Sequence, residues 1–104
     1  DPNRVWGEGY QPRYLQPGAS EYPLQYPEAR NIATWIGQRL NVNFVLSYHN
    51  FGKLILRMPG TRSQKAMPPG DLAVHDYLGK EGEKMLPGYR YVWVAPTLGD
   101  SYGS

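Results

Sequence analysis

Residues 44–56 read FVLSYHNFGKLIL, and this stretch decides the fold class. Its first part, 44–48, is rich in β-forming residues and almost continuously apolar, which is typical of a strand buried on both faces. Residues 49–52 then predict a tight connection, and 54–56 predict a second strand, which Met58-Pro59-Gly60 ends. The stretch therefore predicts short strands that belong to a covered sheet.

Helices are predicted on both sides of this stretch. Over 28–40, Pro27 and Glu28 suit a first turn, and apolar residues recur along one face at positions 29, 32, 33, 36 and 40. A second helix is predicted over 72–86, with Asp71 as its N-cap. A further strand is predicted over 91–95 and ends at Pro96. This alternation predicts an α/β fold, a partial mixed sheet of about three strands flanked by two helices.

Composition narrows the class of protein. The chain has 104 residues, so we expect a single segment of one domain, 1–104. Residues 1–27 hold five prolines and five aromatic residues, which predicts an ordered loop. The net charge of +2 argues against nucleic-acid and anionic-membrane partners, and no apolar run approaches the roughly 20 residues of a membrane helix. The absence of cysteine excludes disulfides and thiolate zinc sites.

A few polar residues stand where chemistry is expected. His49 follows a predicted strand, the position at which open α/β sheets place their ligands, and a neutral imidazole there can bind zinc. Asn3 and Arg4 are a second candidate, because a guanidinium grips a carboxylate through two bonds and an amide adds another. The alternative for His49 is a structural histidine at a strand end, hydrogen-bonded to the backbone. The alternative for Asn3 and Arg4 is a pair of polar surface residues. His75 is interpreted as a half-buried helix histidine, without a second ligand at metal-like spacing.

Several short motifs occur in an order that is characteristic of one family. Residues 1–6, DPNRVW, are similar to a D-x-N-R-N-[FW] segment, and 26–30, YPEAR, to a P-E-[TA]-R helix start. Residues 47–56, SYHNFGKLIL, are similar to S-[IY]-H-S-[YF]-x-x-L-[IL]-L, and Tyr89-Arg90-Tyr91 also fits. In this combination the chain resembles an internal segment of the carboxypeptidase A-like zinc carboxypeptidases, in the form of a bacterial-type member. The resemblance extends over essentially the whole chain.

This resemblance implies a fold, a cofactor and roles for three residues. It implies the central part of the zinc carboxypeptidase fold, with His49 as the zinc ligand that follows a sheet strand. Asn3 and Arg4 match the pair that holds the terminal carboxylate of a peptide substrate. The implied activity is the zinc-dependent hydrolysis of C-terminal residues from peptides, with a peptide C-terminus as the partner. Secretion or a periplasmic location is the favoured localisation.

The sequence departs from the family pattern in several places. The H-x-x-E motif that carries two zinc ligands does not occur in these residues, since neither His49 nor His75 begins one. The general-base glutamate on a strand after the G-S turn is also not found, Gly99 stands near the substrate-capping tyrosine position, and Asn50 replaces the usual serine. A catalytic zinc needs three protein ligands and an open water position. We therefore expect these residues alone to be inactive and assign no catalytic residue.

Two alternatives to a carboxypeptidase segment remain. A non-catalytic module would keep Asn3 and Arg4 and bind peptide C-termini or small acids without turnover. An oligomerising structural remnant would instead associate with another chain through its exposed sheet edges. Loss of peptide binding in Arg4→Ala, without dependence on zinc, favours the first alternative, and a monomer in sedimentation argues against the second.

Overall fold

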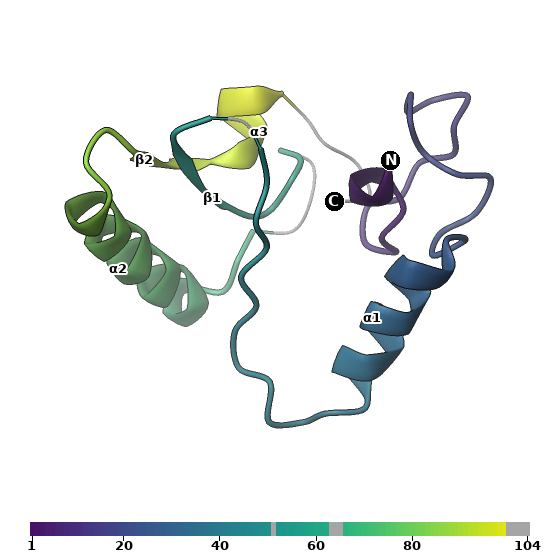
Figure 1. Cartoon of the computed structure of the whole chain (residues 1–104), viewed down its shortest axis with the longest axis horizontal. Coiled ribbons are helices and arrows are strands. Elements are labelled where there is room, and N and C mark those ends of the chain that lie inside the picture. Colours follow the sequence, from purple (N-terminus) through teal and green to yellow (C-terminus); the bar gives the residue numbers. More distant parts are fainter. Residues whose placement is uncertain (51, 63–65, 100–104) are drawn as a thin grey trace. The chain divides into compact units, whose positions relative to one another are not determined.

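The computed structural model describes residues 1–50, 52–62 and 66–99. The elements in order are η1 (Pro2–Arg4), α1 (Pro27–Gly37), β1 (Leu54–Arg57), α2 (Pro69–Met85), β2 (Arg90–Trp93) and α3 (Val94–Leu98), as labelled in Figure 1. The chain divides into two compact units, of which the first is built from Asp1–Asn50 and the second lies within 51–101. The mixture of helices and strands agrees with the predicted α/β class.

The first unit is held together by turns and by a few small buried side chains. Val5 is fully buried, and its carbonyl oxygen accepts a hydrogen bond of 2.7 Å from the backbone N–H of Leu24. Ser20 is also buried; its hydroxyl donates to the carbonyl of Tyr22 at 2.7 Å. The segment predicted as an ordered loop over 1–27 thus consists of η1 and turns up to the start of α1.

Helix α1 begins and ends earlier than its pattern predicts. Pro27 occupies the first turn and Glu28 follows it, as expected, but the helix ends at Gly37 rather than at position 40. The carbonyl of Trp35 accepts a hydrogen bond of 2.8 Å from the Arg39 guanidinium, and the Arg39 backbone N–H bonds to Ile36 instead. The last turn therefore tightens and the helix stops.

Residues 44–48, which the sequence predicts as a buried strand, belong to no helix or strand in the structure. The side chains of Val45, Leu46 and Tyr48 are 58%, 64% and 88% exposed. A strand is stable when its backbone N–H and C=O groups are paired with a neighbour. In the described part of the chain, no backbone hydrogen bond joins 45–48 to another segment. The structure therefore does not confirm the strand predicted over 44–48.

The second unit contains a parallel strand pair, β1 and β2, rather than the predicted mixed sheet. Leu54 stands opposite Arg90 and Arg57 stands opposite Trp93. Helix α2 supplies the crossover that a parallel connection requires. It begins at Pro69, earlier than the predicted position 72, and Pro68 rather than Asp71 is its N-cap. Proline fixes φ at a value that suits the first helical turn, so Pro69 extends the helix toward its N-terminus.

Strand β2 is shorter than predicted, because the chain turns into α3 directly after Trp93. Val94 and Ala95, predicted to continue the strand, lie in the first turn of α3 and are buried, at 8% and 0% exposure. Pro96 follows them within this helix. A proline in the first turn removes no intrahelical hydrogen bond, so it starts α3 as well as ending β2.

Two glycines of α2 let the helix lie close to the strand pair. A Cβ atom at Gly79 would fall 2.1 Å from Cδ2 of Tyr91, and one at Gly82 would fall 2.7 Å from Cδ1 of Ile55. Gly79 is itself buried. Both distances are far below van der Waals contact, so no larger residue fits at either position without a shift of the packed strand side chains.

We expect Gly79→Ala to lower the free energy of unfolding by about 1–3 kcal/mol, the usual cost of overpacking a tight contact. Gly70→Ala is the matched control in the same helix, since nothing lies within 4 Å of a Cβ at that position. Alanine there should leave the stability unchanged or raise it slightly, because it is the better helix former. Urea denaturation checks both variants, and equal effects would contradict the close packing of α2.

Candidate functional site

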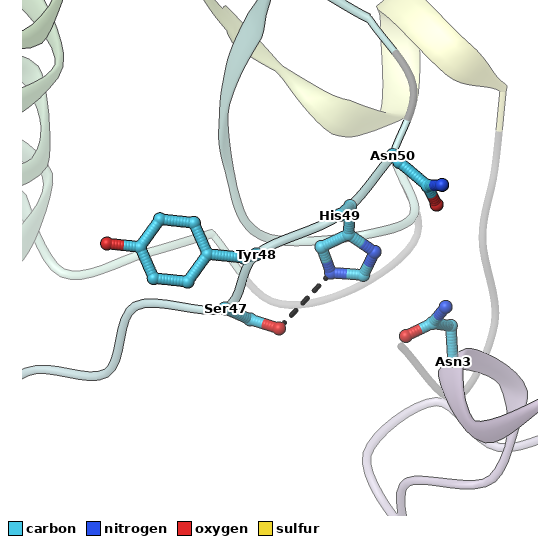
Figure 2. Close-up of a pocket in the computed structure, with 5 residues that line it drawn as sticks. All are labelled: Asn3, Ser47, Tyr48, His49 and Asn50. Carbon is cyan, nitrogen blue, oxygen red and sulfur yellow. Dashed lines mark hydrogen bonds between the residues drawn. The ribbon is translucent and has the colours of Figure 1, made fainter.

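An open hollow of about 420 Å³ in the first unit is lined by Asn3 and by residues 47–50. Figure 2 shows Asn3, which extends from η1, opposite His49 and Asn50 of the extended segment. The structure thus brings two of the three predicted site residues, Asn3 and His49, to one place. Ser47 and Asn50 complete the polar lining, and sequence reasoning did not assign a role to either.

Helix η1 holds Asn3 through its own backbone. The Asp1 carboxylate accepts a hydrogen bond of 2.9 Å from the Asn3 N–H and so caps this short helix. The amino group of Asp1 in turn donates to the carbonyl of Gly18 at 2.7 Å. The carboxamide of Asn3 is consequently carried on an anchored turn. Because a carboxamide offers two donors and an acceptor, Asn3 can bind a carboxylate or a peptide group in the hollow.

Ser47 and His49 are joined by a hydrogen bond of 3.2 Å between Oγ and Nε2. Both side chains lie on one side of the extended segment, whereas Tyr48 points to the other side (Figure 2). This alternation is the two-residue period of extended backbone. The Ser47 hydroxyl restrains the ring of His49, and its i, i+2 spacing is the sequence signal by which it could have been found.

Arg4 does not line the hollow. Its Nη1 donates to the carbonyl oxygen of Asn3 at 2.8 Å, and the side chain is half-buried. The predicted pair of Asn3 and Arg4 is therefore adjacent and hydrogen-bonded, but only Asn3 faces the space beside His49. For Arg4 to bind a carboxylate there, its guanidinium must use the N–H groups that do not donate to the carbonyl oxygen of Asn3.

The donor set of the hollow does not make a complete zinc site. His49 offers one imidazole, and the rest of the described lining offers hydroxyls and carboxamides. In the described ranges, no group of three or more His, Asp, Glu or Cys side chains is placed to hold a metal ion. Any zinc bound at His49 would need its other protein ligands from residues beyond the described ones.

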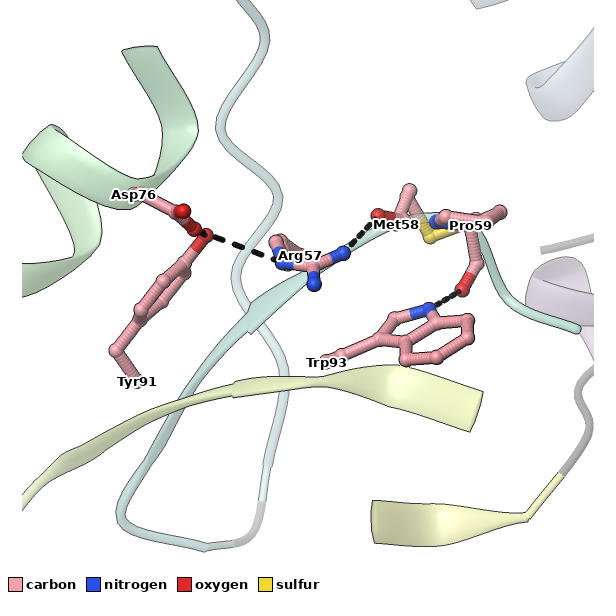
Figure 3. A network of polar contacts seen from close by, with 6 residues as sticks. All are labelled: Arg57, Met58, Pro59, Asp76, Tyr91 and Trp93. Atoms are coloured by element: carbon pink, nitrogen blue, oxygen red, sulfur yellow. Dashed lines mark hydrogen bonds and ion pairs between the residues drawn. The ribbon is translucent and has the colours of Figure 1, made fainter. Parts of the chain in front are cut away.

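A separate polar network in the second unit was not anticipated from the sequence (Figure 3). The Tyr91 hydroxyl donates to Oδ1 of Asp76 at 2.9 Å, and Nε of Arg57 lies 3.8 Å from the same oxygen. The Arg57 guanidinium also stacks 5.4 Å from the ring centroid of Trp93, whose indole N–H donates to the carbonyl of Pro59. The residues come from β1, α2 and β2, which only the fold brings together, so their spacing in the sequence does not predict this network.

Burial and the hydrogen bond to Asp76 raise the pKa of Tyr91 to about 12. The phenol therefore stays protonated when a free tyrosine would ionise, and it keeps donating to the carboxylate. Arg57 acts in the opposite direction on the pKa of Tyr91, but with the smaller effect. The network ties the strand pair to α2 (Figure 3).

Comparison with known proteins gives no assignment. No protein-family model, no curated protein and no solved structure matches this chain significantly. In the described residues, no helix is long and apolar enough to cross a membrane. A function for this chain must therefore be inferred from the residues that line the hollow and from the sequence motifs.

The raised pKa of Tyr91 predicts a loss of stability at alkaline pH. The protonated phenol stabilises the fold below the ordinary tyrosine pKa of about 10, and this contribution is lost as the pH rises toward 12. Tyr91→Phe should remove this part of the pH dependence, whereas Tyr77→Phe, at an exposed position of α2, should keep it. Urea denaturation between pH 9 and pH 12 (roughly the window of the shift) checks this, and equal slopes in both variants would contradict it.

Proposed function

We propose that the chain is a segment of a zinc-dependent metallocarboxypeptidase, which removes C-terminal residues from peptides. The observation that carries the proposal is the hollow in which Asn3 and His49 meet. These residues are far apart in the sequence, and each was matched independently to a family motif. Their meeting in one hollow supports the resemblance, because a chance match of two motifs does not require them to be neighbours.

The chain's own residues have defined roles in this proposal. Asn3 donates from its carboxamide to the terminal carboxylate of the peptide, and Arg4, beside it, supplies the positive charge. His49, held by its hydrogen bond to Ser47, presents its imidazole on the opposite side of the hollow. Since His49 is a single ligand, zinc chemistry depends on protein ligands outside the described residues.

A second candidate function is favoured by the chemistry of the lining. Among the described residues, the hollow is lined by carboxamides, hydroxyls and an imidazole, with no carboxylate side chain that would repel an anion. Such a lining can bind a peptide C-terminus or a small carboxylic acid without a metal ion. A non-catalytic carboxylate-binding module is therefore the alternative to the carboxypeptidase segment.

Both functions predict that Arg4→Ala weakens binding of a peptide with a free C-terminus about tenfold or more. Hydrogen bonds to charged groups contribute about 1.5–3 kcal/mol each, and the variant removes the charged donor. Arg30→Ala, on the exposed face of α1, is the matched control and should bind like the parent chain. NMR titration measures the affinities.

A C-terminally amidated peptide serves as the ligand control, since it lacks the carboxylate. Binding that survives Arg4→Ala, or that is equal for the free and the amidated peptide, would contradict the role of Arg4.

The flanking coding sequence separates the two functions. The carboxypeptidase segment predicts an upstream H-x-x-E motif and a downstream strand that carries a glutamate, because zinc needs further ligands and its water needs a base. Reading the gene on both sides of these 104 residues checks this prediction. A gene without either feature would contradict the carboxypeptidase segment and leave the binding module.

A further inference from the structure

The proposed function gives no role to most of the proline- and aromatic-rich loop, residues 1–27. Residues 13–20 of this loop are ordered without forming a helix or strand, and a backbone hydrogen bond of 3.1 Å joins their two ends. Within them, the N–H of Ala19 donates to the carbonyl of Gln16 at 3.1 Å, and Ala19 and Ser20 are buried. A loop that is folded this tightly can hold a neighbouring element in place.

The loop contacts η1 at both of its ends. At the N-terminal end, the amino group of Asp1 donates to the carbonyl of Gly18 at 2.7 Å. Directly after η1, the carbonyl of the fully buried Val5 accepts a hydrogen bond of 2.7 Å from the N–H of Leu24. The short helix that carries the candidate carboxylate-binding pair is therefore held between two contacts with the loop.

Gly18 lies too close to the start of η1 for a side chain. Its φ of +87° is in the left-handed region, which glycine adopts without strain. A Cβ atom at this position would fall 3.3 Å from Cβ of Asp1 and 3.9 Å from Cγ of Arg4. The first distance is shorter than the optimal separation of two carbon atoms, so a side chain at position 18 would displace Asp1.

Asp1 connects this close contact to the candidate site. Its carboxylate accepts the N–H of Asn3 at 2.9 Å, and its carbonyl accepts the N–H of Arg4 at 3.0 Å. The guanidinium of Arg4 also donates to the carbonyl of Asn3 at 2.8 Å. Because Asp1 bonds to the backbone of both residues, a displacement of Asp1 also displaces the pair.

We propose that Gly18 is a positioning residue for the carboxylate-binding pair, and that the loop supports Asn3 and Arg4 in their binding position. A residue without a side chain lets the loop lie against Asp1, and this contact sets where η1 places the two side chains. The inference rests on the proposed function, in both of its forms, because each requires Asn3 and Arg4 to bind a terminal carboxylate.

The preference for a free over an amidated peptide C-terminus tests this role, because it reports contacts with the carboxylate rather than overall stability. In NMR titrations, Gly18→Ala should reduce this preference about tenfold, as expected for the loss of one hydrogen bond to a charged group. Gly88→Ala is the matched control and should keep the preference of the parent chain. Gly88 has the same φ of +87°, but it lies in the second unit, and a Cβ there would meet Lys53 at an ordinary distance of 3.7 Å.

The outcomes separate this inference from the proposed function. If the parent chain distinguishes the two peptides, an unchanged preference in Gly18→Ala, or an equal reduction in Gly88→Ala, would overturn the role of Gly18 alone. A parent chain that binds both peptides equally would overturn the proposed function and this inference together.

Two substitutions at Asp1 test the same role without altering Gly18. Asp1→Asn and Asp1→Ala both remove the charge, but only asparagine can still accept the N–H of Asn3, since Asn and Asp are similarly good N-caps. Asp1→Ala should therefore reduce the preference for the free C-terminus, and Asp1→Asn should rescue it. Equal preferences in these two variants would overturn the proposal, and circular dichroism confirms that each variant retains the fold.

Discussion

The pairing of backbone N–H and C=O groups is the constraint on which the rest of this structure depends. Among the described residues, β1 and β2 meet this constraint by pairing with each other, whereas 45–48 form no backbone hydrogen bond with another segment. β1 is paired along its length with β2, and the pair supports α2 and the polar network of Arg57, Asp76 and Tyr91. The stretch 44–48 has side chains that suit a strand equally well, but it is not a strand in the structure. Side-chain character selects what can be a strand, and pairing decides what becomes one.

Close packing of α2 shows how one small residue determines the properties of others. Because Gly79 has no side chain, the ring of Tyr91 lies directly against the helix. That position brings the phenol within hydrogen-bonding reach of Asp76 on the same helix. The raised pKa of Tyr91 thus follows from the absence of a Cβ atom at position 79.

The sequence predicts local features of this chain better than its long-range ones. α1, β1 and α2 are recognised from periodicity, proline positions and β-forming residues, with errors only at their ends. The end of β2 at Trp93 was not foreseen, because Pro96 suits a helix start as well as a strand end. The strand predicted over 44–48 is not confirmed in the described residues, since burial and pairing depend on neighbours that no local pattern contains. The network of Arg57, Asp76 and Tyr91 escaped prediction for the same reason.

The candidate site includes residues that directly follow the segment 44–48. Asn3 and His49 were predicted as site residues from the sequence and line one hollow, and the structure adds Ser47 and Asn50 to its lining. Asn3 is fixed by a capped turn, whereas His49 follows residues 45–48, which form no backbone hydrogen bond with another segment among the described residues. A site binds a ligand more tightly when the residues on both of its sides are already ordered, because ordering them on binding costs free energy. A strand that paired with this segment would therefore also restrain His49, so the ligand affinity of the site depends on whether the segment is paired.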